Sequence, residues 1–172
     1  RWTLDQIFES AMQHHIDGID FRGLGNEIDL TKVPAFSTHL DQTLAEMRKR
    51  HLEIPCLHTS VTLISPASDR WQMMLDECGR YARLAQRTGT PFIRVFGGAP
   101  SQELNAEQAL AVARRHLKQI VKICQNHHCL PLVETHDAWA TSSELRELLS
   151  GFSNDEVGVL WVGLVGVGKP AG

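Results

Sequence analysis

The sequence lacks a hydrophobic run long enough to cross a membrane. Its longest apolar stretch, residues 157–168, is interrupted by glycines, whereas a spanning helix needs about 20 predominantly apolar residues. The chain also opens with polar residues spread through a helical pattern, unlike a secretory signal peptide. We therefore expect neither membrane association nor a secretory leader.

Cysteine is scarce as well, and basic residues do not outnumber acidic ones. The four cysteines form neither a CxxC pair nor a dense framework, so reduced thiols in a cytoplasmic protein are the simplest interpretation. A formal net charge of −3 and a pI near 6.3 give no basic field that would attract nucleic acid. The sequence thus argues against a disulfide framework and against a nucleic-acid partner.

What the sequence has is a regular alternation of helix and strand signals. With 172 residues, 42% hydrophobic and 22% charged, the chain suits one globular domain or a piece of a larger one. Cap signals predict helices that start near Thr3, Ser65, Asn105 and Thr141, and Gly89 suits a left-handed helix end. Short apolar segments predict strands centred near residues 20, 56, 94, 133 and 159.

Strands that alternate with helices indicate an α/β fold with a parallel sheet. Two closures compete, an open doubly wound sheet and a (β/α) barrel of the TIM type. The open sheet usually has a glycine-rich phosphate turn after its first strand, but "FRGLGNEI" lacks the third glycine. Polar residues recur where the predicted strands end, which is typical of a barrel. The barrel is therefore the favoured fold.

The polar strand ends supply the candidate site residues, which are Arg22, His58, Arg94, Glu134 and His136. Each has a structural alternative. Glu134 and Arg94 can pair with each other, because a lone charge inside a sheet is costly. Arg22 can pair with Asp20 or Glu134, and the two histidines can bond loops. Strand alternation places His136 on the same side as Glu134 and Thr135 on the opposite side.

At these strand ends the sequence resembles the xylose isomerase-like barrels, the sugar-phosphate isomerase and epimerase group. The segments that carry the resemblance are "GIDFRG", "IPCLHTS", "PFIRVFGG", "LVETHD" and "VGVLW", in this order. The resemblance runs over residues 1–161. It implies a divalent metal (Mn, Mg, Co or Zn) at the carboxyl ends of the strands and proton transfer on a sugar or polyol.

Carried over by position, the resemblance makes Glu134 the metal ligand and a catalytic residue. Arg22, His58, Arg94 and His136 are candidate substrate contacts because of their positions at the strand ends. The Asp and His expected after Trp161 are absent, and Val162 stands in the place of the Asp. By this count the chain is an incomplete, truncated barrel with about five of the eight βα units of a complete one. Residues 1–161 form the partial barrel, and residues 162–172 form an atypical tail rich in Gly and Val.

Three functions follow as hypotheses. The first is a metal-dependent sugar isomerase or epimerase that acts through an enediolate and is impaired by its missing strands and ligands. The second is a non-catalytic barrel fragment or binding module. The third is an apurinic endonuclease-like DNA repair enzyme. The net negative charge of the chain and the presence of one clear metal ligand, Glu134, argue against it. The missing strands also predict self-association, because they leave sheet edges unpaired.

Overall fold

The structure is a computed structural model that describes residues 2–64, 68–100 and 104–162. From residue 40 onwards helices and strands alternate along it, as the sequence predicts. The elements are, in chain order, α1 (Leu4–Gln13), η1 (Leu30–Lys32), η2 (Pro34–Phe36), α2 (Leu40–Lys49), β1 (Cys56–Thr62), α3 (Ser68–Thr88), β2 (Phe92–Phe96), α4 (Ala106–Gln125), β3 (Leu130–Glu134), η3 (Asp137–Trp139), α5 (Ser142–Leu149) and β4 (Gly158–Leu160).

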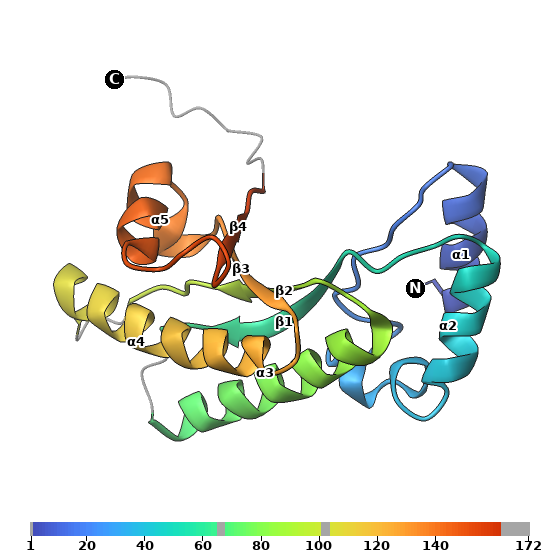
Figure 1. Ribbon diagram of the computed structural model, residues 1–172, viewed down its shortest axis with the longest axis horizontal. Coiled ribbons are helices and arrows are strands. Elements are labelled where there is room, and N and C mark those ends of the chain that lie inside the picture. The colour runs from blue at the N-terminus through green and yellow to red at the C-terminus, as the bar shows by residue number, and fades with distance from the viewer. Residues whose placement is uncertain (1, 65–67, 101–103, 163–172) are drawn as a thin grey trace.

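The four strands form one parallel sheet in the order β1-β2-β3-β4. Neighbours in the sheet are neighbours in the chain, so each crossover helix connects adjacent strands, as in a (β/α) barrel. Helices α3 and α4 lie side by side along one face of the sheet, and β4 stands up from the plane of β1 and β2 (Figure 1). The parallel α/β fold is therefore confirmed.

The segment near residue 20, predicted as a strand, pairs with β1 only through isolated bridges. Gly18 bridges Glu53 and Phe21 bridges Leu57, both in the parallel sense. The offset between partners changes by one residue from the first bridge to the second, so the ladder is interrupted. Between the bridges the Cys56 N–H donates to the Asp20 carboxylate at 2.9 Å, not to a backbone carbonyl. A side-chain hydrogen bond thus replaces one backbone hydrogen bond between the two segments.

The predicted helix boundaries are mostly confirmed. Reciprocal capping boxes begin α1 at Thr3, α4 at Asn105 and α5 at Thr141. Gly89 has a φ of 72° just after α3, as the left-handed helix end requires. The predicted start at Ser65 lies outside the described residues, as does most of the predicted tail.

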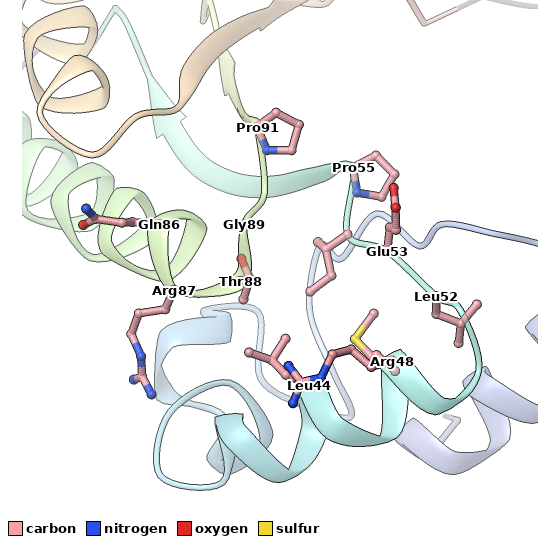
Figure 2. A pocket seen from close by; sticks show the side chains of 12 residues that line it. Leu44, Arg48, Leu52, Glu53, Pro55, Gln86, Arg87, Thr88, Gly89 and Pro91 are labelled. Carbon is pink, nitrogen blue, oxygen red and sulfur yellow. The ribbon is translucent and has the colours of Figure 1, made fainter.

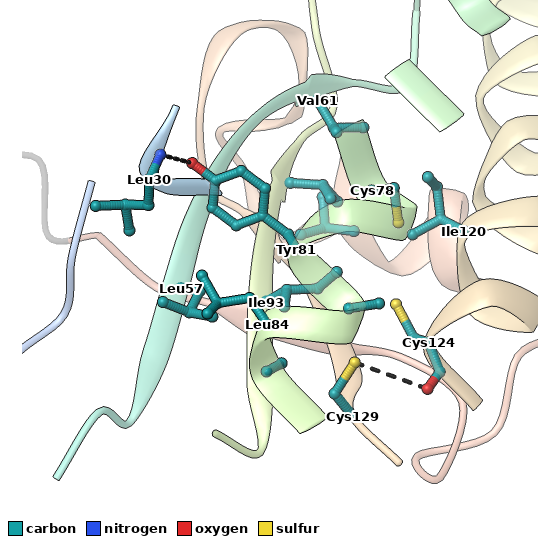
Figure 3. Close-up of a cluster of buried hydrophobic side chains, with 14 of the residues drawn as sticks. Leu30, Leu57, Val61, Cys78, Tyr81, Leu84, Ile93, Ile120, Cys124 and Cys129 are labelled. Atoms are coloured by element: carbon teal, nitrogen blue, oxygen red, sulfur yellow. Dashed lines mark hydrogen bonds between the residues drawn. The ribbon is translucent and has the colours of Figure 1, made fainter. Parts of the chain in front are cut away.

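The hydrophobic core lies between the sheet and the helices α3 and α4. Figure 3 shows Tyr81 and Cys78 of α3, Ile93 of β2 and Ile120 of α4 in one buried cluster, each of them fully buried. All four cysteines are free and buried, so no disulfide holds this core together. Among the described residues no helix is both long and apolar enough to cross a membrane.

Candidate active site at the carboxyl ends of the strands

The carboxyl ends of β1, β2 and β3 bring three of the five predicted site residues into contact. His58 is the register partner of Arg94, and Phe96 is the register partner of Glu134. Because side chains two residues apart on a strand share a face, Arg94 and Phe96 lie on the same side of β2. The parallel sheet therefore places His58, Arg94 and Glu134 on adjacent strands at one end.

Arg94 and Glu134 form a buried ion pair, the structural alternative that the sequence left open. Arg94 Nε lies 2.8 Å from Glu134 Oε2, and the two side chains are only 4% and 11% exposed. Burial lowers the pKa of Arg94, and the Glu134 carboxylate opposes that shift. Two buried charges of opposite sign compensate each other, whereas either one alone would be costly.

The guanidinium of Arg94 is held on three further sides. Its Nη1 donates to the Thr59 carbonyl of β1 at 2.7 Å, and its Nη2 lies 3.2 Å from His58 Nδ1. Its Cζ lies 3.9 Å from the centroid of the Phe96 ring, which adds a cation–π contact. Arg94 is therefore fixed in place by β1, by its own strand and by Glu134.

His58 lies between Arg94 and Asp20. Burial lowers the pKa of His58, and the charge of Arg94 lowers it further, while Asp20 opposes the shift. The ring is therefore neutral near pH 7. Because Arg94 can only donate, His58 Nδ1 accepts and the ring proton sits on Nε2. That Nε2 is buried without a hydrogen-bond partner among the described residues, 3.7 Å from Asp20 Oδ2.

Arg22 lies beside this group but forms no ion pair with Asp20 or Glu134 in the described part of the chain. Its Nη2 donates to Ser60 Oγ at 3.0 Å. Its Nη1 is buried without a hydrogen-bond partner among residues 2–64, 68–100 and 104–162. A buried donor that lacks a partner is unusual in a native protein and calls for an explanation such as a bound water or ligand.

His136 follows β3 at the outer side of the site. Its side chain is 52% exposed, and its Nδ1 lies 2.9 Å from Asp137 Oδ1. Its ring meets Phe96 edge-on, with 5.2 Å between the centroids. Phe96 thus stands between Arg94 and His136. Sequence reasoning did not single out Phe96, although its position two residues after Arg94 places both side chains on one face.

Thr135 separates the site from the last described segment. It is buried, and its Oγ1 bonds the backbone of Val162, accepting from the N–H at 2.9 Å and donating to the carbonyl at 3.2 Å. Val162 stands where the resemblance expects an acidic ligand. Cys56, at the start of β1, is no nucleophile, because burial raises the pKa of its thiol to about 12.

The described residues do not fit the divalent metal that the resemblance implies. No group of three or more His, Cys, Asp or Glu side chains within the described ranges comes together closely enough to hold an ion. Oxygen-ligated cations need about six donors, and water can supply only some of them. Glu134, the expected ligand, already meets a cation in Arg94.

A cavity of about 730 Å³ lies at the opposite end of the sheet. It is lined by α2, by the end of α3 and by the residues just before β1 and β2, among them Pro55 and Pro91 (Figure 2). Active sites of parallel barrels form at the carboxyl ends of the strands, and the amino ends serve stability. The volume of this cavity therefore does not make it the candidate site.

A sequence profile of the xylose isomerase-like TIM barrel family matches residues 8–162. The chain belongs to this family. The match covers most of the chain, so the fold inferred from the strand-end segments is confirmed. No protein of curated function matches the chain.

Solved structures of this fold are similar at low identity. The probable 3-DHS dehydratase AsbF from Bacillus anthracis shares 19% identity at a TM-score of 0.74, over 94% of this chain and 58% of that one. The zinc-bound IolI protein shares 15% at 0.76, over 92% and 57%. The 3-keto-D-glucoside 4-epimerase YcjR from E. coli shares 11% at 0.71, over 91% and 61%. At such identities the likeness shows the fold alone.

This xylose isomerase-like chain spans less than two thirds of those relatives. The predicted roles of Arg22, His58, Arg94, Glu134 and His136 stay predictions. Their arrangement is a finding: the first four gather around one strand-end cluster, and His136 lies at its exposed edge.

Proposed function

We propose that this chain carries part of the active site of a sugar isomerase or epimerase, with Glu134 as the group that moves the proton. The observation that supports this most is the position of the Glu134 carboxylate. Its Oε2 lies 2.8 Å from Arg94 Nε in an ion pair without hydrogen-bond geometry, and no hydrogen bond joins its Oε1 to the described residues. The carboxylate is thus paired with a cation, but its oxygens are not saturated by protein donors, and it lies at the carboxyl ends of the strands, where barrels have their active sites.

The proposed chemistry is proton transfer at a carbon next to a carbonyl. Glu134 Oε1 would take the proton and return it to the neighbouring carbon while the hydroxyl proton passes to the former carbonyl oxygen, which isomerises the substrate through an enediolate. Protonation of the same carbon by water on the opposite face would epimerise it. The unpartnered Nη1 of Arg22 is the donor best suited to the oxygen that becomes negative. The other predicted substrate contacts are His58 and, at the exposed edge, His136.

A sugar or polyol is the proposed substrate class. The 3-keto-D-glucoside 4-epimerase named above and a D-tagatose 3-epimerase-like protein, which is 16% identical, have sugars in their names. Cationic Arg22 and the neutral ring of His58 suit hydroxyl and carbonyl oxygens. A cytoplasmic location, suggested by the buried free thiols, and the absence of nucleic-acid and membrane partners remain part of the proposal. No step of it uses a metal ion, because the described residues do not fit one.

Solvent deuterium exchange tests the proposal without requiring complete turnover. The chain is incubated in D2O with D-fructose or D-tagatose, and the loss of the proton next to the carbonyl is followed by NMR. We expect slow exchange with the wild-type chain and at least tenfold slower exchange with Glu134→Gln, since a neutral amide cannot accept the proton. Glu9→Gln, an exposed glutamate of α1, serves as control and should exchange as fast as wild type.

The second candidate is a non-catalytic binding module. It is favoured by the lack of a three-ligand metal cluster in the described part of the chain, and the same observation speaks against an endonuclease, which needs several metal ions. Equal exchange by wild type and Glu134→Gln contradicts the proton-transfer role. If saturation-transfer NMR then still detects bound sugar, the binding module is the better description.

A further inference from the structure

The cation that meets Glu134 is the feature of this chain that departs most from its family resemblance. The resemblance assigns the carboxylate to a divalent metal ion, whereas Arg94 Nε lies 2.8 Å from it. We infer that the guanidinium of Arg94 permanently takes the place at Glu134 that the resemblance assigns to a metal. Arg94 is then a positioning residue, which holds the carboxylate by its charge at 2.8 Å from one oxygen.

The burial of both charges supports this inference. At 4% and 11% exposure, neither charge is solvated well enough to be stable alone. A divalent ion bound to Glu134 would stand beside a guanidinium that cannot lose its proton. The two like charges would repel each other in a site with little water to screen them.

Arg94 also cannot turn away easily to admit an ion. The Thr59 carbonyl holds its Nη1, His58 Nδ1 accepts from its Nη2, and the Phe96 ring lies under its plane. Removing Arg94 from Glu134 would break these contacts together. An arginine that is fixed on several sides loses little further conformational entropy in keeping its ion pair.

The nitrogen and oxygen ligands nearest the pair are engaged elsewhere. His58 Nδ1 faces Arg94, while its protonated Nε2 faces Asp20 and has no lone pair to offer a metal. His136 Nδ1 faces Asp137. Within the ranges that the structure describes, nothing completes a ligand set around Glu134. The inference holds whichever reaction the chain supports, because it concerns only the partner of Glu134.

Calorimetric titration with manganese chloride tests the inference directly. The 172-residue wild-type chain and Glu134→Gln are titrated under the same conditions, with Glu9→Gln as control. We expect the three proteins to bind manganese equally weakly or not at all, since the carboxylate is already neutralised. Binding by wild type that Glu134→Gln weakens tenfold or more, and that Glu9→Gln leaves unchanged, would overturn the inference.

A double-mutant cycle of Arg94 and Glu134, measured by thermal unfolding, is the second test. It reports the coupling between the two side chains without any metal ion present. Arg94→Met leaves the Glu134 charge buried without a partner, so we expect a lower Tm or loss of folding. Adding Glu134→Gln to Arg94→Met should raise the Tm again or restore a cooperative transition. Arg48→Met, at an exposed arginine of α2, should change the Tm little.

The inference requires that Glu134→Gln does not weaken manganese binding and that Glu134→Gln restores stability to Arg94→Met. Additive losses from Arg94→Met and Glu134→Gln would mean that the two side chains act independently. The same conclusion applies if the double variant fails to recover from an unfolded Arg94→Met. In either case Arg94 would not be the cation that neutralises Glu134.

Discussion

Tyr81 links helix α3 to the loop that precedes the sheet. Its hydroxyl accepts the Leu30 N–H at 3.0 Å and donates to the Ile28 carbonyl at 3.3 Å, and its ring is fully buried in the core (Figure 3). Burial raises the pKa of Tyr81 to about 12, because the charged phenolate would lose both water and its role as a donor. A single residue thus couples core packing to alkaline stability.

Tyr81 is the only tyrosine of the chain, so its titration can be followed by absorbance near 295 nm. We expect a midpoint of about 12 for the folded protein and of about 10 in denaturant. The folded pKa is the higher one, so this stabilisation is complete below pH 10. It is lost as the pH rises towards 12 and amounts to roughly 2–3 kcal/mol at most.

The matched variant is Tyr81→Phe, which keeps the ring and removes the hydroxyl. It should be less stable at pH 7 by roughly 1–3 kcal/mol, because the buried Leu30 N–H loses its acceptor. Its free energy of unfolding should also fall less between pH 10 and 12 than that of wild type. A wild-type midpoint near 10 in the folded state would show that the hydroxyl is not buried as described.

Among the elements, the turn after β2 and the short helix η3 depend on each other. A Cβ on Gly97 would lie 1.9 Å from Trp139 Cδ1, so only glycine leaves room for the indole. Trp139 Nε1 donates to the Gly98 carbonyl at 3.0 Å, and Gly98 has a φ of 79°. The two glycines therefore allow the loop after β2 to receive a tryptophan from the segment after β3, next to the candidate site.

Gly97→Ala is expected to be destabilising by about 1–3 kcal/mol or more in chemical denaturation, because overpacking forces Trp139 out of its position. Gly79→Ala is the matched control. Gly79 lies inside α3, where the nearest atom to an added Cβ is Arg83 Nη1 at 3.6 Å, so alanine should stabilise the helix by about 0.5–1 kcal/mol.

A second change shows whether Trp139 is the cause. Replacing Trp139 by Leu in the Gly97→Ala variant removes the clash. Trp139→Leu should therefore lower the free energy of unfolding less in that variant than in wild type. If the costs of Gly97→Ala and Trp139→Leu simply add, the loss comes from the turn backbone and not from the indole.

At the scale of the whole molecule, β4 is the last strand of the sheet and has a neighbour on one side only among the described residues. Large apolar side chains are exposed on and just after it: Val159, Trp161 and Val162, of which Trp161 is 64% exposed. Unpaired strand edges and contiguous apolar surface promote association.

We therefore expect the 172-residue chain to self-associate. Sedimentation velocity at increasing concentration should show species larger than a 19.2 kDa monomer. Val159→Lys with Trp161→Lys places charges at the edge and should shift the distribution towards monomer. Met73→Lys, at another exposed apolar position, is the control for added charge. A concentration-independent monomer, or an equal effect of Met73→Lys, would mean that the β4 edge does not drive association.

The order of the elements and their boundaries follows from the sequence itself. Capping boxes at Thr3, Asn105 and Thr141 and the helix end at Gly89 are local patterns, so residues within one turn decide them. The alternation of βα signals and the polar strand ends favoured a barrel, and the family was predicted on the same segments. These features need no knowledge of which residues meet across the sheet.

The partners of the site residues were decided only by the tertiary structure. The sequence left Glu134 with either a metal or Arg94, and the register of β2 against β3 brings the guanidinium to the carboxylate. It allowed Arg22 to pair with Asp20, yet Asp20 accepts from the Cys56 N–H and Arg22 bonds Ser60. Such contacts join residues tens of positions apart, and a shift of one residue in register would exchange every one of them.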